Sequence, residues 1–122
     1  MPYSYDDQNI FAKILRGEIP NDTVLETEHS LAFNDIQPQA PVHVLVIPKG
    51  PYVCYDHFAQ TATDAEILDY TRTIGEVCKL KDVHDDGFRL ISNAGEAGVQ
   101  EVPHLHVHIL GGRPLGRMLQ KA

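Results

Sequence analysis

Histidine and aliphatic residues alternate near the carboxyl end of the chain, over residues 104–109 (HLHVHI). Alternation with period two is typical of a β-strand whose two faces meet different surroundings. The aliphatic residues are expected on one face, and His104, His106 and His108 on the other. We therefore predict a strand over residues 104–109 with one covered face and one open face.

Shorter apolar runs predict further strands. Residues 24–27 and 31–34 flank a polar stretch and are typical of a hairpin. Residues 43–47 are rich in β-branched and aliphatic side chains and form the strongest strand signal of the first half. Residues 88–92 follow an Asp-Asp-Gly turn and predict another strand.

Two helices are expected. Asn9 can cap a short helix, which Gly17 would end. Thr63 and Glu66 have the spacing of a capping box and predict a long helix that ends near Leu80. Its buried stripe is expected at helical spacing, namely Ile67, Tyr70, Ile74, Val77 and Cys78.

The order of these elements is typical of an α+β chain, with helices packed on one side of a mainly antiparallel sheet. Residues 52–62, before the long helix, are expected to be a connection with some aromatic content. Residues 1–8 are expected to be a flexible leader. Residues 9–122 then form a single domain, because the chain contains no repeat or linker.

Composition and charge exclude several classes of protein. A net charge of −7 and a pI near 5.3 argue against a general nucleic-acid binder, which needs a basic surface. No apolar run approaches the ~18 residues of a membrane span, and the polar, acidic start is not typical of a signal peptide. Cys54 and Cys78 form no disulfide or metal motif. We therefore expect a cytoplasmic protein with no membrane or nucleic-acid partner.

Three interpretations of the histidine face are open. The side chains could be hydrogen-bonded histidines on a solvated strand, or zinc ligands in His-x-His spacing. Imidazole also titrates near pH ~6.5, so it can act as nucleophile or acid in catalysis at phosphorus, which we favour. His43 would share a face with Leu45 and Ile47. It is either a hydrogen-bonded core histidine or a residue held near a site.

The stretch before the histidines, residues 93–102, contains Gly95 and Gly98. Glycine allows a close approach of the backbone to a ligand, and exposed N–H groups can hold a phosphate. The alternative is an ordinary hairpin loop.

The residues of the histidine strand match His-x-His-x-His-x-x with hydrophobic x, so the chain resembles the histidine triad superfamily. Further segments resemble this family, namely 9–14, 18–20, 31–36, 38–43 and 46–49. Residues 111–116 (GGRPLG) look like the ending of the bacterial Hint-like branch. The resemblance implies a five-stranded antiparallel sheet with one short and one long helix, and a homodimer in which two such sheets join. It also implies a hydrolase for purine nucleoside 5′-phosphoramidates, such as adenosine 5′-monophosphoramidate, with no cofactor.

The same resemblance implies roles for individual residues. His106 would be the nucleophile that forms a nucleotidyl-histidine. His104 and His108 would contact the phosphate or the leaving group, and His43 would support the central histidines. The nucleotide-binding set would be Phe11 and Phe33 near the base, Asp35 and Ile36 at the ribose and base, and Asn93, Gln100, Val102 and, less directly, Glu101 on the phosphate side. For His106 to attack, its other ring nitrogen should donate to a carbonyl, which fixes the tautomer.

Several positions depart from the family pattern. Glu101 replaces a serine found in many members, and a carboxylate is a doubtful ligand for phosphate. Val99 replaces a common glycine, so the local backbone is expected to differ. Pro103 removes one N–H before His104. Residues 9–12 lack the Cys-x-x-Cys of some relatives, so we predict no metal.

Two other functions compete with the phosphoramidase. One is hydrolysis of dinucleoside polyphosphates, against which the Hint-like ending argues. The other is a nucleotide- or metal-binding interaction protein without relevant turnover, although the sequence offers no carboxylate at a clear ligand spacing to complete a metal site. Residues 113–122 are expected to reach the neighbouring subunit.

Overall fold

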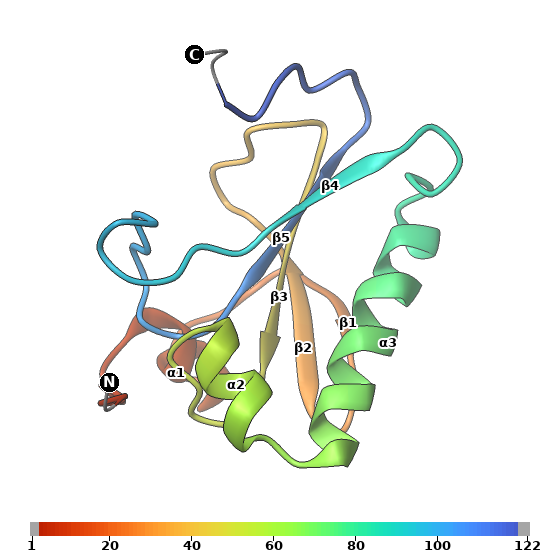
Figure 1. The fold of residues 1–122 in the computed structure, drawn as a ribbon. Helices are drawn as coiled ribbons and strands as arrows, with labels where there is room; N and C mark the ends of the chain where they lie inside the picture. The colour runs from red at the N-terminus through yellow and green to blue at the C-terminus, as the bar shows by residue number, and fades with distance from the viewer. Residues whose placement is uncertain (1–2, 120–122) are drawn as a thin grey trace.

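Five antiparallel strands form the centre of the molecule in a computed structural model that describes residues 3–119 (Figure 1). The outer ends of the expected leader and domain, residues 1–2 and 120–122, lie outside the described residues. The strand order is β1-β2-β3-β5-β4, which confirms the predicted antiparallel α+β sheet. The strands are β1 (Thr23–Glu26), β2 (Ser30–Asn34), β3 (Val42–Pro48), β4 (Phe88–Ile91) and β5 (Val107–Gly111).

Both predicted helices are confirmed. Helix α1 (Ile10–Leu15) is capped by the Asn9 side chain, which accepts a hydrogen bond from the Ala12 N–H. Helix α3 (Asp64–Leu80) begins with the predicted capping box, in which the Thr63 and Glu66 side chains each bond the other's backbone N–H. No helix within residues 3–119 is both long and apolar enough to cross a membrane.

The connection over residues 52–62 contains a helix that was not predicted, α2 (Tyr55–Thr61). Its N-cap, Cys54, makes no side-chain capping bond, so the usual start signal is missing. Only Phe58 of this helix is buried. One buried residue in two turns leaves no helical period to recognise in the sequence.

Helices cover both faces of the sheet, rather than one face as predicted. Alternate residues of a strand point to opposite faces. On β3, Val44 and Val46 belong to the core beneath α2 and α3, together with Phe58, Tyr70 and Val77. Leu45 and Ile47 alternate with these valines along β3, and they pack with Phe11 and Ile14 of α1. The sheet therefore has a large core on one side and a smaller one under α1 on the other.

The predicted strand over residues 104–109 begins three residues late, at Val107. The reason lies at Pro103, around which the chain makes a tight turn: the His104 N–H donates to the Val102 carbonyl at 2.9 Å. The fixed φ of proline suits such a three-residue turn. His104 and His106 consequently sit on irregular backbone, although Leu105, Val107 and Ile109 all enter the large core as predicted.

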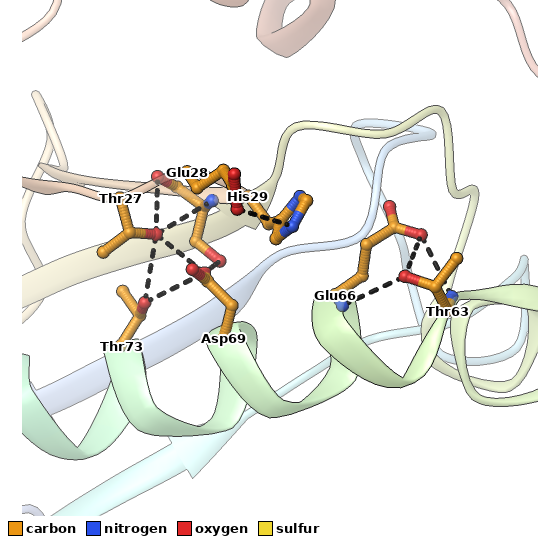
Figure 2. A network of polar contacts seen from close by, with 8 residues as sticks. Thr27, Glu28, His29, Thr63, Glu66, Asp69 and Thr73 are labelled. Carbon is orange, nitrogen blue, oxygen red and sulfur yellow. Dashed lines mark hydrogen bonds and ion pairs between the residues drawn. The ribbon is translucent and has the colours of Figure 1, made fainter.

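A half-buried carboxylate ties the β1–β2 hairpin to α3 (Figure 2). Asp69 of α3 accepts hydrogen bonds from the hydroxyls of Thr27, at 2.7 Å, and Ser30, at 2.6 Å. Ser30 has no exposed surface, so water cannot replace this acceptor. The hairpin is therefore fixed to the helix by polar contacts as well as by its apolar side chains.

Candidate active site

The four histidines predicted to share a site do converge, on the face of the sheet that α1 covers. His43 comes from β3 and His108 from the neighbouring β5, while His104 and His106 lie on the segment that leads into β5. The edge of the Phe11 ring approaches His106, with ring centroids 5.0 Å apart. Only 6 % of His106 is exposed, so the histidine face is not the open face that the alternation predicted.

His106 is held in one tautomer. Its Nδ1 lies 2.8 Å from the His104 carbonyl oxygen, which can only accept, so the proton is on Nδ1. The lone pair of the neutral ring is then on Nε2, for which no partner occurs among the described residues. This agrees with the expectation that one ring nitrogen donates to a carbonyl and leaves the other free to attack.

His43 and His108 form a second pair, whose protons can also be assigned. The backbone N–H of Gln39 donates to His43 Nδ1 at 3.0 Å, so the His43 proton lies on Nε2. That Nε2–H donates to His108 Nδ1 at 2.9 Å. The remaining proton of neutral His108 is therefore on its Nε2. The rings of His106 and His108 are 5.0 Å apart, so the site places a lone pair beside an N–H donor.

His104 differs from the other members of the triad because both of its ring nitrogens are engaged. Nε2 donates to the Pro48 carbonyl at 2.8 Å, and Nδ1 accepts from the Tyr5 hydroxyl at 2.6 Å. The residue has no exposed surface. The expected contact between His104 and a phosphate therefore lacks a free nitrogen, and the geometry favours a supporting role.

Burial dominates the electrostatics of the histidines. It lowers the pKa of His104 to about 4, against a smaller rise from the bond to the Pro48 carbonyl. It also lowers the pKa of His108 to about 4, assisted by the neighbouring His106 and His43. The pKa of His106 is lowered for the same reason, although Asp35 and Glu101 oppose the change. The histidines of the site are therefore uncharged at neutral pH.

The structure places a carboxylate beside two of the histidines, which the sequence did not indicate and which bears on the metal interpretation. Asp35 lies 3.4 Å from His43 Nε2, and these two residues and His108 offer ligand atoms within 4.8 Å of one another. Ligation through His43 Nε2 needs that nitrogen deprotonated and the proton on Nδ1. A proton on Nδ1 would point at the Gln39 N–H, so two hydrogen-bond donors would face each other. The donor set at this position therefore does not fit a metal ion.

The expected base and ribose residues differ in exposure. Phe11 and Phe33 pack edge to face, with centroids 5.7 Å apart, and are 6 % and 5 % exposed. They are core residues that leave little ring surface for a base. Ile36 is 88 % exposed and follows Asp35 on the loop after β2. One Asp35 oxygen lies 3.4 Å from His43 Nε2 and the other accepts from the Gln37 N–H at 2.8 Å, so both carboxylate oxygens have partners within the protein.

The expected phosphate-side loop is held by Gln100. Its side-chain oxygen accepts from the Gly95 N–H, and its Nε2 donates to the Val53 and Val102 carbonyls, at 2.7 and 3.0 Å. All polar atoms of this amide are thus used within the protein, so the side chain shapes the loop and is not free for phosphate. Gly98 also has a fixed role, because a Cβ there would lie 2.5 Å from the Ala94 carbonyl.

The remaining residues of the expected phosphate-side loop lie around the Gln100 side chain. Val102 packs against the core under α1, Asn93 is half-buried just after β4, and Glu101 is exposed. Val99 adopts φ +58, the left-handed conformation that glycine tolerates best. Valine in place of glycine is therefore strained at this position.

Sequence reasoning missed the residues that orient the histidines. Gln39 and Pro48 act through backbone atoms, which carry no residue-specific signal. Ser92 donates through its hydroxyl to the His106 carbonyl at 3.2 Å. Tyr5 lies in the expected flexible leader, where two tyrosines among acidic and polar residues were the only available signal.

Comparison with known proteins supports the family resemblance. Residues 16–115 match the family model for the HIT domain. The chain is 56 % identical over 121 residues to an uncharacterized 13.2 kDa HIT-like protein of Azospirillum brasilense, covering 99 % of each. It is 41 % identical over 114 residues to the purine nucleoside phosphoramidase of Escherichia coli K12, covering 93 % of this chain and 94 % of that protein.

A solved structure gives the same result for the fold. A histidine triad protein from Clostridium difficile superimposes with a TM-score of 0.81 at 39 % identity, over 95 % of this chain and all of that one. The match of the family model spans all five strands of the sheet and all four histidines of the site. The chain therefore belongs to the HIT domain family.

Proposed function

We propose that this protein hydrolyses the P–N bond of purine nucleoside 5′-phosphoramidates through a covalent nucleotide on His106. The observation that carries the proposal is the free Nε2 of His106 beside the Nε2–H of His108, in a buried site. The similarity to a purine nucleoside phosphoramidase of Escherichia coli supports the choice of substrate.

The reaction would take two steps at phosphorus. In the first, the His106 Nε2 lone pair forms an N–P bond while the bond from phosphorus to the leaving amine breaks. In the second, water attacks phosphorus and gives a proton to His108, which has lost its own to the amine. The bond to His106 breaks, and the nucleoside monophosphate leaves. The Nδ1–H bond to the His104 carbonyl stabilises the positive charge that develops on His106 during the first step.

The leaving amine needs a proton, for which His108 is the best-placed source. Its pKa of about 4 is too low for it to carry an extra proton at neutral pH. The negative charge of a bound phosphate raises the pKa of a nearby imidazole, so substrate binding would bring the proton with it. The extra proton would lie on His108 Nδ1, and the His43 Nε2–H would then bond Asp35 Oδ2, 3.4 Å away, in place of His108. Asp35 assists, because its carboxylate raises the pKa of His108.

The test is hydrolysis of adenosine 5′-monophosphoramidate in excess chelator by the wild type and by His106→Ala. We expect turnover by the wild type and near-background rates for the variant. His29→Ala is the matched control, because His29 lies on the β1–β2 turn and pairs with Glu28, and it should keep the wild-type rate (Figure 2). A wild type that is inactive until zinc is added, or an active His106→Ala, would overturn the proposal.

We also propose that two copies join their sheets through β4. Among the described strands β4 pairs only with β5, so its other edge is free. Phe88 and Leu90 on this strand are 42 % and 45 % exposed. A free edge with exposed apolar residues favours pairing with another strand. Sedimentation should show a dimer that Leu90→Pro weakens and that Leu68→Glu, on the outer side of α3, leaves intact.

A further inference from the structure

The amino-terminal segment makes a direct contact with the triad. The Tyr5 hydroxyl lies 2.6 Å from His104 Nδ1, and its ring meets His104 edge-on with centroids 5.6 Å apart. Because the Pro48 carbonyl fixes the His104 proton on Nε2, the Tyr5 hydroxyl must be the donor. Burial raises the pKa of Tyr5, so the phenol keeps this proton at neutral pH.

The segment that carries Tyr5 is attached on both sides of it. Tyr3 stacks on His57 of α2, with centroids 4.5 Å apart and planes inclined by 10°, and its hydroxyl donates to Asp56. Beyond Tyr5, the Arg16 guanidinium donates to the Asp7 carbonyl at 2.7 Å. These contacts hold the Tyr5 side chain over His104.

His104 in turn orients the nucleophile through its backbone. Its carbonyl accepts the His106 Nδ1–H at 2.8 Å, and this bond leaves Nε2 as the attacking atom. Residues 104–106 lie outside the ladder of β5, and the peptide that carries this carbonyl is held on its other side by the Leu105 N–H, which donates to the Tyr52 carbonyl at 2.8 Å. The His104 side chain, bonded at both ring nitrogens, is a second anchor for the same peptide.

We propose that Tyr5 is a positioning residue for the reaction: its hydroxyl holds His104 in one tautomer and orientation, and thereby directs the His104 carbonyl that orients His106. The proposal rests on the proposed function of His106. Without the hydroxyl, His104 Nδ1 becomes a buried acceptor with no donor, and the ring can rotate or exchange its proton to find one. The carbonyl would then move, and His106 would populate the wrong tautomer.

The experiment compares Tyr5→Phe with Tyr3→Phe. Both variants remove one hydroxyl from the same segment, but only Tyr5 bonds to a histidine of the triad. Rates with adenosine 5′-monophosphoramidate give kcat and KM. Long-range ¹H–¹⁵N spectra of the imidazoles report which nitrogen of His106 carries the proton. Circular dichroism checks that both variants fold.

Tyr5→Phe should lower kcat about tenfold, the scale of one lost hydrogen bond on a buried group, with KM within about twofold. The His106 spectrum should change from one tautomer to a mixture, and Tyr3→Phe should match the wild type in both readouts. An unchanged His106 tautomer in Tyr5→Phe overturns the proposal whatever its rate. Equal losses in both variants overturn it too, since they would reflect packing of the segment.

The two proposals fail in different ways. If the wild type does not hydrolyse the phosphoramidate, the proposed function fails. The spectra of the wild type and Tyr5→Phe still decide whether Tyr5 controls the His106 tautomer.

Discussion

Val99 is the residue whose backbone conformation fits its side chain least. It has φ +58 with a β-branched side chain, and 69 % of it is exposed. A β-branched residue in this region is strained, and here no burial of the side chain offsets the cost. Strain of this kind is common where a loop must hold a ligand.

Val99→Gly should therefore stabilise the protein, by about 0.5–1 kcal/mol. This is the left-handed penalty of valine less the extra entropy of glycine in the unfolded chain. Urea unfolding of the two proteins measures the difference. Val24→Gly in β1 is the control and should destabilise, because an extended strand gains nothing from glycine. Equal midpoints for Val99→Gly and the wild type would show that the loop is unstrained.

Asp35 should control the pH range of turnover. Its carboxylate raises the pKa of His108, so Asp35→Asn lowers that pKa further below the ordinary value. If His108 delivers the proton to the amine, the alkaline limb of the kcat profile moves to lower pH, by about one unit. Glu101→Gln is the control, since Glu101 acts on His106 and is not among the groups that shift His108. If the alkaline limb of the Asp35→Asn profile stays at the wild-type pH, Asp35 does not control the pH range of turnover.

At the residue scale, the sequence predicted which residues gather at the site better than it predicted what each one does. Alternation and the triad motif identified His104, His106 and His108 correctly as neighbours. They could not show that Tyr5 and Pro48 occupy both nitrogens of His104, because these partners are distant in the sequence. Tautomers depend on such three-dimensional contacts and have no sequence period.

At the scale of elements, the contact between α3 and the β1–β2 hairpin depends on one carboxylate. Asp69→Ala should destabilise the protein by about 1–3 kcal/mol, because the fully buried Ser30 hydroxyl loses its acceptor. Glu76→Ala, on the exposed side of the same helix, is the control for helix propensity and should change stability by less than about 0.5 kcal/mol. Thermal unfolding of both variants gives the comparison. Equal effects would mean that apolar packing alone holds the hairpin.

The elements that the sequence predicted well are those with strong local signals. The capping box of α3 and the alternation of the strands are local, and both were confirmed. Helix α2 was missed because it has one buried residue and no side-chain cap. The late start of β5 follows from the turn at Pro103, and the coverage of both faces by helices depends on packing between elements distant in sequence.

For the whole molecule, the buried neutral histidines predict loss of stability in mild acid. The folded pKa of His104 is about 4, and the unfolded value is about 6.5. Between these values the unfolded chain binds a proton that the folded protein cannot, so stability is full above pH ~6.5 and falls toward pH ~4. The shift corresponds to a loss on the order of 3 kcal/mol from His104 alone.

Urea unfolding between pH 7 and pH 5 measures this effect, since most carboxylates remain charged there. The free energy of unfolding should decrease steadily as the pH falls through this range. A constant value from pH 7 to pH 5 would show that His104 is protonated in the folded protein.

The place of β5 in the sheet also determines when a nascent chain can become active. This strand is the last in the sequence, yet it lies between β3 and β4 and contributes to the site. Domains begin to fold from the amino terminus during synthesis, so the β1–β2–β3 meander and α3 can form first. Strand β4 must then wait unpaired until residues 107–111 emerge from the ribosome. The sheet is completed and His106, the proposed nucleophile, reaches its place in the same late event, so a prematurely terminated product has neither.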